Sequence, residues 1–392
     1  MTGVLPTTRT TPFDPPQEVL DDPRPLRRIT FADGHVGWLV AGYELGRAVL
    51  ADQRFSSRLE RRRALIRRPR VAEFRGASAP PGFFIGMDPP DHTRLRRLLT
   101  GQFTVRRMKA LEPRVEQIVV EHLDAMAQAA PPVDLVSAFA LPIPSLVICE
   151  LLGVPYADRE RFQRDSSVLL SLTATDEAAA AAMGSLMGYL TELVARKHAE
   201  PTDDLLSGLV AGGELGDDEL VGVAFLLLIA GHETTANMLA LGTFALLTNP
   251  EQAEALREGR AEVANAVEEL LRYLTIIQFG ITRTAVEDVE LGGEVIHADE
   301  SVAVYAPTVN RDPARFPRGH DLDLTADAHG HLAFGHGVHQ CLGQQLARIE
   351  MRVAYPALLR RFPTLRLAEP PEDVPLRDDM AIYGVHHLMV EW

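Results

Sequence analysis

The segment with the clearest chemical potential is residues 334–343, which combine three glycines, two histidines and one cysteine. The glycines let the backbone adopt positive φ angles and approach a flat ligand closely. Cys341 stands just before a helical pattern at residues 344–361, and a helix N-terminus favours the thiolate form that binds metals. The segment therefore predicts Cys341 as a metal ligand, with a structural cysteine in a glycine-rich turn as the alternative. Cys149 lies in an apolar stretch and is predicted to be a core residue.

A second candidate site lies inside the most apolar helical pattern, residues 217–247. A helix of that length would span roughly 45 Å, and because it is apolar almost all round we expect it to cross the protein centre. In its middle, residues 230–235 read Ala-Gly-His-Glu-Thr-Thr, which predicts a local bulge or kink. A hydroxyl beside a carboxylate, here Thr234 and Glu233, can relay protons. His232 could face a substrate or fill a turn.

Three further sets of charged residues could bind an anion or form a pair. His92 and Arg96 are four residues apart, so they share one face of a predicted helix. Glu269 and Arg272 are three apart on a helical pattern and can pair. Arg283 lies in a strand-like segment. Taken singly, His92 and Arg96 could equally be a surface pair, and Glu269 and Arg272 a pair that occurs by chance on a helix. Arg283 could be an ordinary charged residue of a strand.

In this order along the chain, the segments resemble the cytochromes P-450, a family of haem-thiolate monooxygenases. The cysteine segment carries the match through Phe334, Gly337, His339, Cys341 and Gly343. The resemblance extends over residues 26–392 and is closest to soluble bacterial enzymes, among them actinomycete hydroxylases of xenobiotics and natural products. It implies haem b as cofactor, with the cysteine thiolate as proximal iron ligand.

The resemblance also implies roles for the other motifs. Glu233 corresponds to the family's acid, where Asp is commoner, and Thr234 to the alcohol beside dioxygen. The Glu269–Arg272 pair would hold the cysteine loop, so Ala at either position should abolish haem incorporation. The usual third partner of this pair is an arginine, which this chain lacks at the expected place, near Asp321; the candidates to replace it are His320 and Arg318.

Contacts with the haem are implied for ten residues. Two arginines and two histidines among them suit the two propionate carboxylates, because both residue types donate to carboxylates held away from water. These four are His92, Arg96, Arg283 and His339. The full set is His92, Arg96, Ala230, Gly231, Arg283, Phe334, Gly335, His339, Cys341 and Gly343.

The distal pocket is implied only by analogy, and its walls are mostly apolar. They would come from residues 59–84, 168–173, 225–228, 230, 275–280 and 380–383, with Phe84, Leu227, Ile277 and Ile382 as candidate contacts. Apolar walls predict a hydrophobic substrate, such as a macrolide, polyketide, terpenoid or steroid-like compound. An arginine cluster could meet a carboxylated or phosphorylated substrate or be a solvated face: Arg58, Arg61, Arg62, Arg63, Arg67, Arg68, Arg70 and Arg75.

No flavin or nicotinamide segment accompanies the family core, so the resemblance implies electrons from a ferredoxin and its reductase, with dioxygen as oxidant. A positive patch on the cysteine side would steer an acidic donor; its predicted members are Arg94, Arg97, Arg106, Arg107, Lys109, Arg348 and Arg352. Three alternatives remain: a peroxide-driven oxygenase, a haem sensor or carrier without turnover, and a haem-free helical binding protein.

Composition restricts the class of protein. The net charge of −15 excludes the basic footprint of a nucleic-acid binder. Two cysteines make no disulfide framework and fit a reducing cytosol. Residues 1–16 have no apolar signal region, and the most apolar run, 221–230, is about half a membrane span. We therefore expect a soluble, cytoplasmic protein.

The elements that must position these residues are mainly helical. Apolar residues recur every three or four positions over residues 107–128, 177–198, 217–247, 251–274 and 344–361. Strands are predicted in two short regions: a hairpin around Asp33-Gly34, and a hairpin around Gly292-Gly293 followed by residues 301–305. The prediction is a mainly α fold with small β-sheets, which by resemblance is the P-450 fold with haem between the long central helix and the helix after Cys341. Although length alone suggests two or three domains, no composition shift marks a boundary, so residues 1–392 are predicted as one domain whose first 25 residues are mostly coil.

Overall fold

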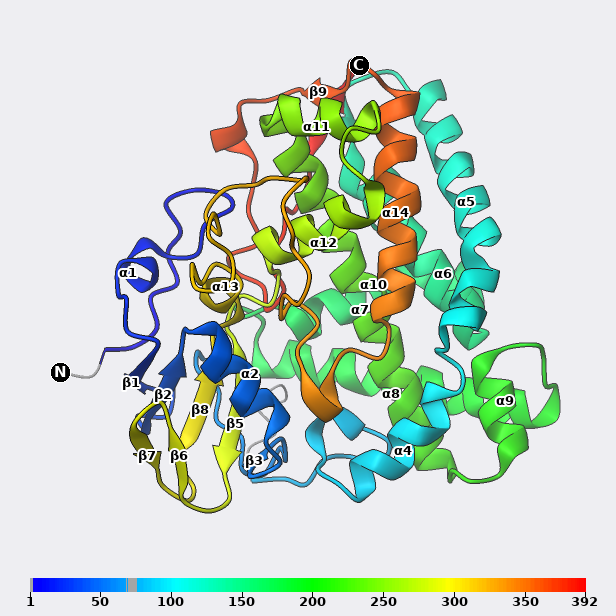
Figure 1. Cartoon of the computed structure of the whole chain (residues 1–392). Coiled ribbons are helices and arrows are strands. Elements are labelled where there is room, and N and C mark those ends of the chain that lie inside the picture. Colours follow the sequence, from blue (N-terminus) through cyan, green and yellow to red (C-terminus); the bar gives the residue numbers. More distant parts are fainter. Residues whose placement is uncertain (1–2, 68, 70–75) are drawn as a thin grey trace.

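The structure is a computed structural model that describes residues 3–67, 69 and 76–392. Helices make up most of it (Figure 1). They are α1 Gln17–Leu20, α2 Tyr43–Ala51, α4 Asp91–Thr100, α5 Val105–Gln128, α6 Pro142–Leu152, α7 Arg159–Leu170, α8 Asp176–Ala199, α9 Leu205–Gly212, α10 Asp217–Thr248, α11 Pro250–Arg257, α12 Val263–Leu274, α13 Ala306–Val309 and α14 Gln344–Arg361. Single 3₁₀ turns include η1 Phe84–Gly86 and η4 Gly337–His339, and η2 Val136–Ala140 is a π-helical turn.

The strands form three small sheets, of which the five-stranded and the two-stranded sheet lie at one side of the helices, whereas β9 of the third sheet lies near α11 and the C-terminus (Figure 1). The largest has the order β1-β2-β8-β5-β3, in which β2 and β8 pair in parallel and the other neighbours are antiparallel. Its strands are β1 Leu26–Thr30, β2 Val36–Val40, β3 Phe55–Ser56, β5 Ile281–Ala285 and β8 Ser301–Val304. The others are β6 Val289–Leu291 with β7 Glu294–Ile296, and β4 Val133–Asp134 with β10 Met389–Glu391 and β9 Arg366–Leu367.

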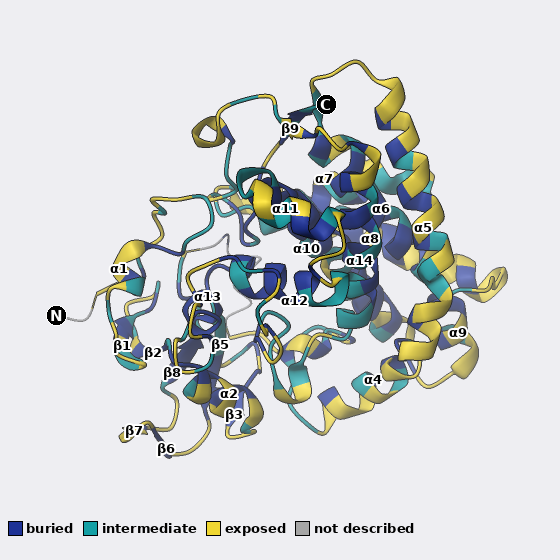
Figure 2. Cartoon of the chain, turned by 45° about the horizontal axis from the view of Figure 1, so that its top comes forward, coloured by how far each residue is buried: buried dark blue, intermediate teal, exposed yellow. Residues whose placement is uncertain are grey.

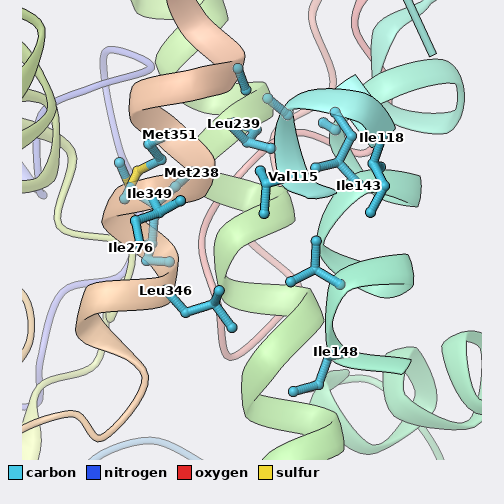
Figure 3. Close-up of a cluster of buried hydrophobic side chains, with 14 of the residues drawn as sticks. Val115, Ile118, Ile143, Ile148, Met238, Leu239, Ile276, Leu346, Ile349 and Met351 are labelled. Atoms are coloured by element: carbon cyan, nitrogen blue, oxygen red, sulfur yellow. The ribbon is translucent and has the colours of Figure 1, made fainter. Parts of the chain in front are cut away.

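Helix α10 is the centre of the hydrophobic core. It is coloured almost entirely as buried in Figure 2, whereas outer helices such as α5 and α9 expose one face. Figure 3 shows aliphatic side chains of α5, α6 and α14 converging on it, among them Val115, Ile148 and Leu346. This packing explains why a helix that is apolar all round is stable here, since no face of it needs water.

Most predicted elements are confirmed. Both hairpins form, and Gly292 and Gly293 adopt φ angles of +60° and +84°, which only glycine takes readily in such a turn. The predicted helix at residues 251–274 is wrong as one element: α11 ends at Arg257, and Gly259 in a left-handed conformation (φ +75°) separates it from α12. The restriction of strands to two regions is also wrong, because β3, β4, β9 and β10 lie outside them. Strands of two or three residues are too short to show a period.

Two helices, α8 and α10, are long and apolar enough to cross a membrane by length and composition alone. In α10, 67% of the most apolar window is buried inside the protein, as expected of a core helix. Helix α8 packs against α7 and α10. Two such helices are therefore weak evidence for membrane insertion.

Candidate active site

The cysteine loop precedes α14 and lies beside α4 (Figure 1). The backbone N–H of Cys341 donates to the carbonyl of Phe334 (2.8 Å), which closes the loop. Gly335 and Gly337 have positive φ angles of +69° and +71°. A Cβ on Gly337 would lie 2.3 Å from the carbonyl oxygen of Leu50. Glycine is therefore required at residue 337 both for conformation and for close packing against α2.

The surroundings of Cys341 act on its thiol in two directions. Protein atoms crowd the sulfur, and this desolvation raises the pKa of the thiol. Hydrogen bonds from the backbone N–H groups of Gly343 and Gln344, and the charges of Arg96 and Arg348, act against that rise. Such groups stabilise a thiolate. By surface area Cys341 is nevertheless an exposed residue, so it can contact a ligand.

The other cysteine has none of these features. Cys149 is buried in α6, and burial raises the pKa of its thiol to about 12. A thiol in that state packs like a small hydrophobic side chain. The prediction of Cys149 as a core residue is confirmed.

Four cationic or imidazole groups gather beside this loop from three separate elements. His92 and Arg96 come from α4, Arg283 from β5 and His339 from the loop itself. The rings of His92 and His339 have centroids 4.1 Å apart, and Arg96 Nη2 donates to the carbonyl of Gln340 (2.6 Å). The structure thus brings together the four residues predicted to bind propionates.

This cluster has buried donors without acceptors. Neither ring nitrogen of His92 has a hydrogen-bond partner in the described part of the chain. Burial and the charge of nearby Arg62 lower the pKa of Arg283 to about 10, and burial together with Arg283 lowers the pKa of His339 to about 3. Among residues 3–67, 69 and 76–392, no carboxylate forms an ion pair with Arg96 or Arg283. Two guanidinium groups and two neutral imidazoles that can donate an N–H fit the two carboxylates of an anionic ligand.

Arg62 was not among the residues predicted to bind a cofactor. Its charge lowers the pKa of both Arg283 and His339, so it lies near the cluster. The sequence places it only within an arginine-rich run, and nothing in that run distinguishes it from its neighbours.

The middle of α10 presents a partly accessible stripe. Ala230 is exposed and Thr234 partly exposed, although most of this helix is buried. The Thr234 hydroxyl donates to the carbonyl of Ala230 (2.8 Å). The helix is continuous from Asp217 to Thr248, so a bulge does not form, and the alternative of a kink stays a prediction. A threonine hydroxyl can donate to a carbonyl of the preceding turn without breaking the helical pattern.

Gly231 has a packing function in α10. A Cβ at this residue would lie 2.6 Å from two side-chain carbons of Ile148 in α6. Glycine therefore allows the two helices to approach closely. Its predicted contact with haem is not tested by this arrangement.

His232 and Glu233, the two residues before Thr234 in α10, are both buried, whereas Thr234 is partly exposed. The carboxylate of Glu233 is buried and forms an ion pair with Arg377 of the C-terminal segment (Nη2–Oε2 3.2 Å), and Asn237 Nδ2 donates to the Glu233 carbonyl (2.7 Å). His232 is also buried, with Nδ1 2.6 Å from the carbonyl oxygen of Leu228. Its ring lies edge-on to Phe162 of α7, which fits a core histidine between helices.

Comparison with known proteins identifies this arrangement. The family model described as Cytochrome P450 matches residues 191–382. "Cytochrome P450 105C1" of Streptomyces sp is 50% identical over 389 residues, which cover 98% of this chain and 97% of the relative. The chain belongs to the cytochrome P450 family.

Two further relatives show how closely this P450 follows others. "Pentalenic acid synthase" of Streptomyces avermitilis is 46% identical over 99% of this chain and 97% of the relative. The crystal structure of CYP105P1 in complex with filipin I superposes with a TM-score of 0.93 at 44% identity, covering 100% of this chain and 99% of that one. These relatives confirm the predicted fold class, the actinomycete type and a haem-dependent monooxygenase.

The cofactor of the family is haem b, and the residues of this P450 fit it. The cationic cluster supplies donors for two propionates, and Cys341 supplies a single sulfur ligand. In the described residues, no group of three or more His, Cys, Asp or Glu side chains forms a metal site. An iron held by a porphyrin needs no such group, because one axial thiolate suffices.

The Glu269–Arg272 pair is buried in α12 and bidentate, with N–O distances of 2.7 and 2.8 Å. The remaining donors of Arg272 reach backbone carbonyls of Asn310 and Gly319 (2.8 Å each) and Asp321 (3.0 Å). The third partner is therefore backbone rather than a side chain. Asn310 Oδ1 in turn accepts the N–H of Leu332, where the cysteine loop begins.

Neither residue predicted to replace the third partner does so. Arg318 is 67% exposed and pairs with Asp321 and Asp323, and His320 is exposed. A second buried group adjoins the first: Glu268 binds Arg348 (2.6 and 2.8 Å) and His331 (3.1 Å). Nothing in the spacing of these three residues predicts this contact.

Three of the predicted pocket walls meet in the structure. Ile277 and Ile382 form an isolated β-bridge, and both side chains are partly exposed. The N–H of Ala381 donates to the carbonyl of Leu170 (2.7 Å), at the end of α7. Phe84 and Leu227, the other two candidates, are buried, and the Phe84 ring lies 6.1 Å from that of His92.

Three described members of the arginine cluster form ion pairs within the chain. Arg58 pairs with Glu60 and Asp88, Arg61 with Asp299, and Arg63 with Asp33. Exposed pairs of this kind suit a solvated surface. Arg68, Arg70 and Arg75 lie outside the described residues, as does part of the predicted wall at 59–84.

Two members of the predicted positive patch, Arg348 and Arg352, are only partly exposed. Arg348 is partly buried in its ion pair with Glu268, so it does not contribute a free charge to the surface. Arg94 pairs with Glu219. Arg97, Arg106, Arg107 and Lys109 are exposed, as the predicted patch requires.

Proposed function

We propose that this P450 hydroxylates or epoxidises a hydrophobic natural product, with dioxygen as oxidant and electrons from a ferredoxin and its reductase. The observation that carries the proposal is the acid–alcohol pair of α10, Glu233 and Thr234, in a core helix with an accessible stripe at Ala230 and Thr234. Splitting dioxygen requires protons at a buried site, which a carboxylate and a hydroxyl can relay. A haem carrier or sensor needs no such pair.

The proposed binding roles follow from the cluster at the cysteine loop. Cys341 binds the iron, and His92, Arg96, Arg283 and His339 hold the propionates. Phe334, Gly335, Gly343, Ala230 and Gly231 are proposed to contact the haem. When bound, the haem supplies the iron at which dioxygen is activated.

The ion pair with Arg377 adds a requirement to proton transfer. Glu233 Oε2 lies 3.2 Å from Arg377 Nη2, and the Thr234 hydroxyl is engaged with the carbonyl of Ala230. To pass a proton to Thr234, the Glu233 side chain must leave Arg377 or act through water. Arg377 therefore holds the carboxylate between turnovers.

The partly exposed apolar bridge of Ile277 and Ile382 supports a hydrophobic substrate. Phe84 and Leu227 are proposed to contribute to the same pocket. The relatives have natural-product names: one structure holds filipin I, and another protein is a pentalenic acid synthase. A polyketide, macrolide, terpenoid or steroid-like compound is the proposed class. The protein is proposed to act in the cytoplasm.

Electrons would enter from an acidic ferredoxin at the cysteine side. The exposed residues Arg97, Arg106, Arg107 and Lys109 support this docking site. A positive patch on a chain of net charge −15 would make association sensitive to salt.

The test is reconstitution with a ferredoxin, its reductase and NADPH, after a compound library is screened for a low-spin to high-spin shift. The expected result is an oxygenated product that requires both electron-transfer proteins and dioxygen. Product formed equally well from hydrogen peroxide alone would indicate the peroxide-driven alternative. Reduction of the haem with no product from any spin-shifting compound would indicate a carrier or sensor.

A further inference from the structure

A short N-terminal segment, residues 9–14, lies against the C-terminal turn, residues 380–383. We name this segment the strap. The guanidinium of Arg9 stacks over the ring of Tyr383, 3.7 Å from its centroid. The Tyr383 hydroxyl donates to the carbonyl of Pro12 (2.7 Å), and Arg9 Nη1 donates to the carbonyl of Asp14 (2.8 Å). The two contacts with Tyr383 join the strap to the turn, and the bond between Arg9 and Asp14 holds the strap itself together.

The strap is also anchored to the helical core. Arg311, whose side chain is 1% exposed, pairs with Asp14 and donates to the carbonyl of Phe13 (2.7 Å). The Phe13 ring packs against Phe244 of α10 at a centroid distance of 5.0 Å. A segment without regular structure is thereby fixed at both its side chains and its backbone.

The other side of the turn touches the proposed pocket walls. The N–H of Tyr383 donates to the carbonyl of Ile276 (2.9 Å), and Ile382 forms the bridge with Ile277. Ala381 reaches Leu170 of α7. The turn is thus held between the strap outside and two walls inside. Its links to those walls also include the hydrogen bond from Gln278 Nε2 to the carbonyl of Met380 (2.6 Å) and the bridge between Ser171 and Met380, and the bridges are isolated rather than part of a continuous sheet.

We propose that the strap positions the substrate-pocket wall, and that Arg9 and Tyr383 are positioning residues for ligand recognition. The inference rests on the proposed pocket at Ile277 and Ile382. Because bridges and separate hydrogen bonds hold the turn on its inner side, the strap contacts on its outer side add to the stability of its closed position and raise the fraction of molecules in which the wall is in place. A ligand that needs the wall binds more weakly in proportion to that fraction.

The experiment uses the holoenzyme and two azoles that bind ferric haem iron. Imidazole is small, whereas 4-phenylimidazole carries an aromatic ring that needs an ordered apolar wall. Arg9→Ala removes the stacking contact, and Tyr383→Phe removes only the hydroxyl. Arg24→Ala is the matched control, because Arg24 is 68% exposed and its ion pair is with Asp22 alone. Affinities are measured from the Soret shift, together with haem content and melting temperature.

We expect Arg9→Ala and Tyr383→Phe each to weaken the binding of 4-phenylimidazole by about three- to tenfold, which is the usual contribution of one such contact. In both variants the affinity for imidazole and the haem content should stay within about twofold of the parent protein. Arg24→Ala should leave the affinities for both azoles unchanged. Unchanged binding of both azoles, tighter binding of 4-phenylimidazole, or equal weakening of both would overturn the proposal. Absence of any Soret shift in the parent protein would instead refute the haem site itself.

Discussion

Glu269→Ala should be among the most damaging single changes outside the cysteine loop. The substitution removes the bidentate partner of Arg272, whose side chain is 3% exposed. It also removes the acceptor for the N–H of Asp323 (3.0 Å). Arg272 would remain bonded to three backbone carbonyls, but its charge would have no counter-ion.

The expected loss can be estimated from burial. Breaking a buried ion pair by deleting one partner costs about 3 to 5 kcal/mol, because the remaining charge stays desolvated. Domains of this kind have a total unfolding free energy of about 5 to 15 kcal/mol. Arg272 is joined through Asn310 to the start of the cysteine loop. Loss of the ion pair should therefore also disorder the cysteine loop at the haem site.

The assay is urea unfolding followed by circular dichroism, with the haem-to-protein ratio measured on the same preparations. Glu269→Ala should lower the unfolding free energy by at least about 3 kcal/mol and abolish haem incorporation. Arg318→Ala is the control, since its exposed pairs with Asp321 and Asp323 should contribute less than about 1 kcal/mol. A Glu269→Ala protein with full haem content and an unfolding free energy lowered by less than about 1 kcal/mol would show that the Glu269–Arg272 pair does not stabilise the haem site.

Three further outcomes are expected. Burial would raise the pKa of Glu268, but hydrogen bonds from Arg348 and His331 outweigh it and lower the pKa from 4.5 to about 2. The resulting stabilisation, about 3 kcal/mol, is complete above pH 4.5 and is lost as the pH falls toward 2. Glu268→Gln should therefore flatten the dependence of the unfolding free energy on pH between these two values. Arg283→Ala should speed haem transfer to apomyoglobin at least about tenfold, and an unchanged rate would exclude a propionate contact. Thr234→Ala should lower product formed per NADPH by about a hundredfold while NADPH oxidation continues; full coupling would rule out the proposed relay.

Patterns that are local in sequence were predictable. The helix after Cys341 begins and ends at the predicted residues, because its apolar period is regular from Gln344 to Arg361. The four propionate candidates were found through a family resemblance, and the structure places them in one cluster. The three glycines of the cysteine loop were predicted to allow a positive φ; Gly335 and Gly337 have one, whereas Gly343 has a φ of −82°.

Contacts between distant segments were not predictable from spacing. Arg377 and Glu233 pair across the fold, and so do Arg348 and Glu268. In each case a single charged residue is indistinguishable by type from many others on the surface. Arg348 was for this reason predicted to be part of a surface patch. Its burial depends on the packing of α12 against α14, which no local period encodes.

The most direct test of the account is the spectrum of the reduced protein under carbon monoxide, before and after Cys341→Ser. The parent protein should show the red-shifted Soret band of a thiolate-ligated haem. The variant should lose that band, because serine cannot supply the sulfur ligand. An identical spectrum and haem content in the variant would contradict the assignment of Cys341 as the iron ligand.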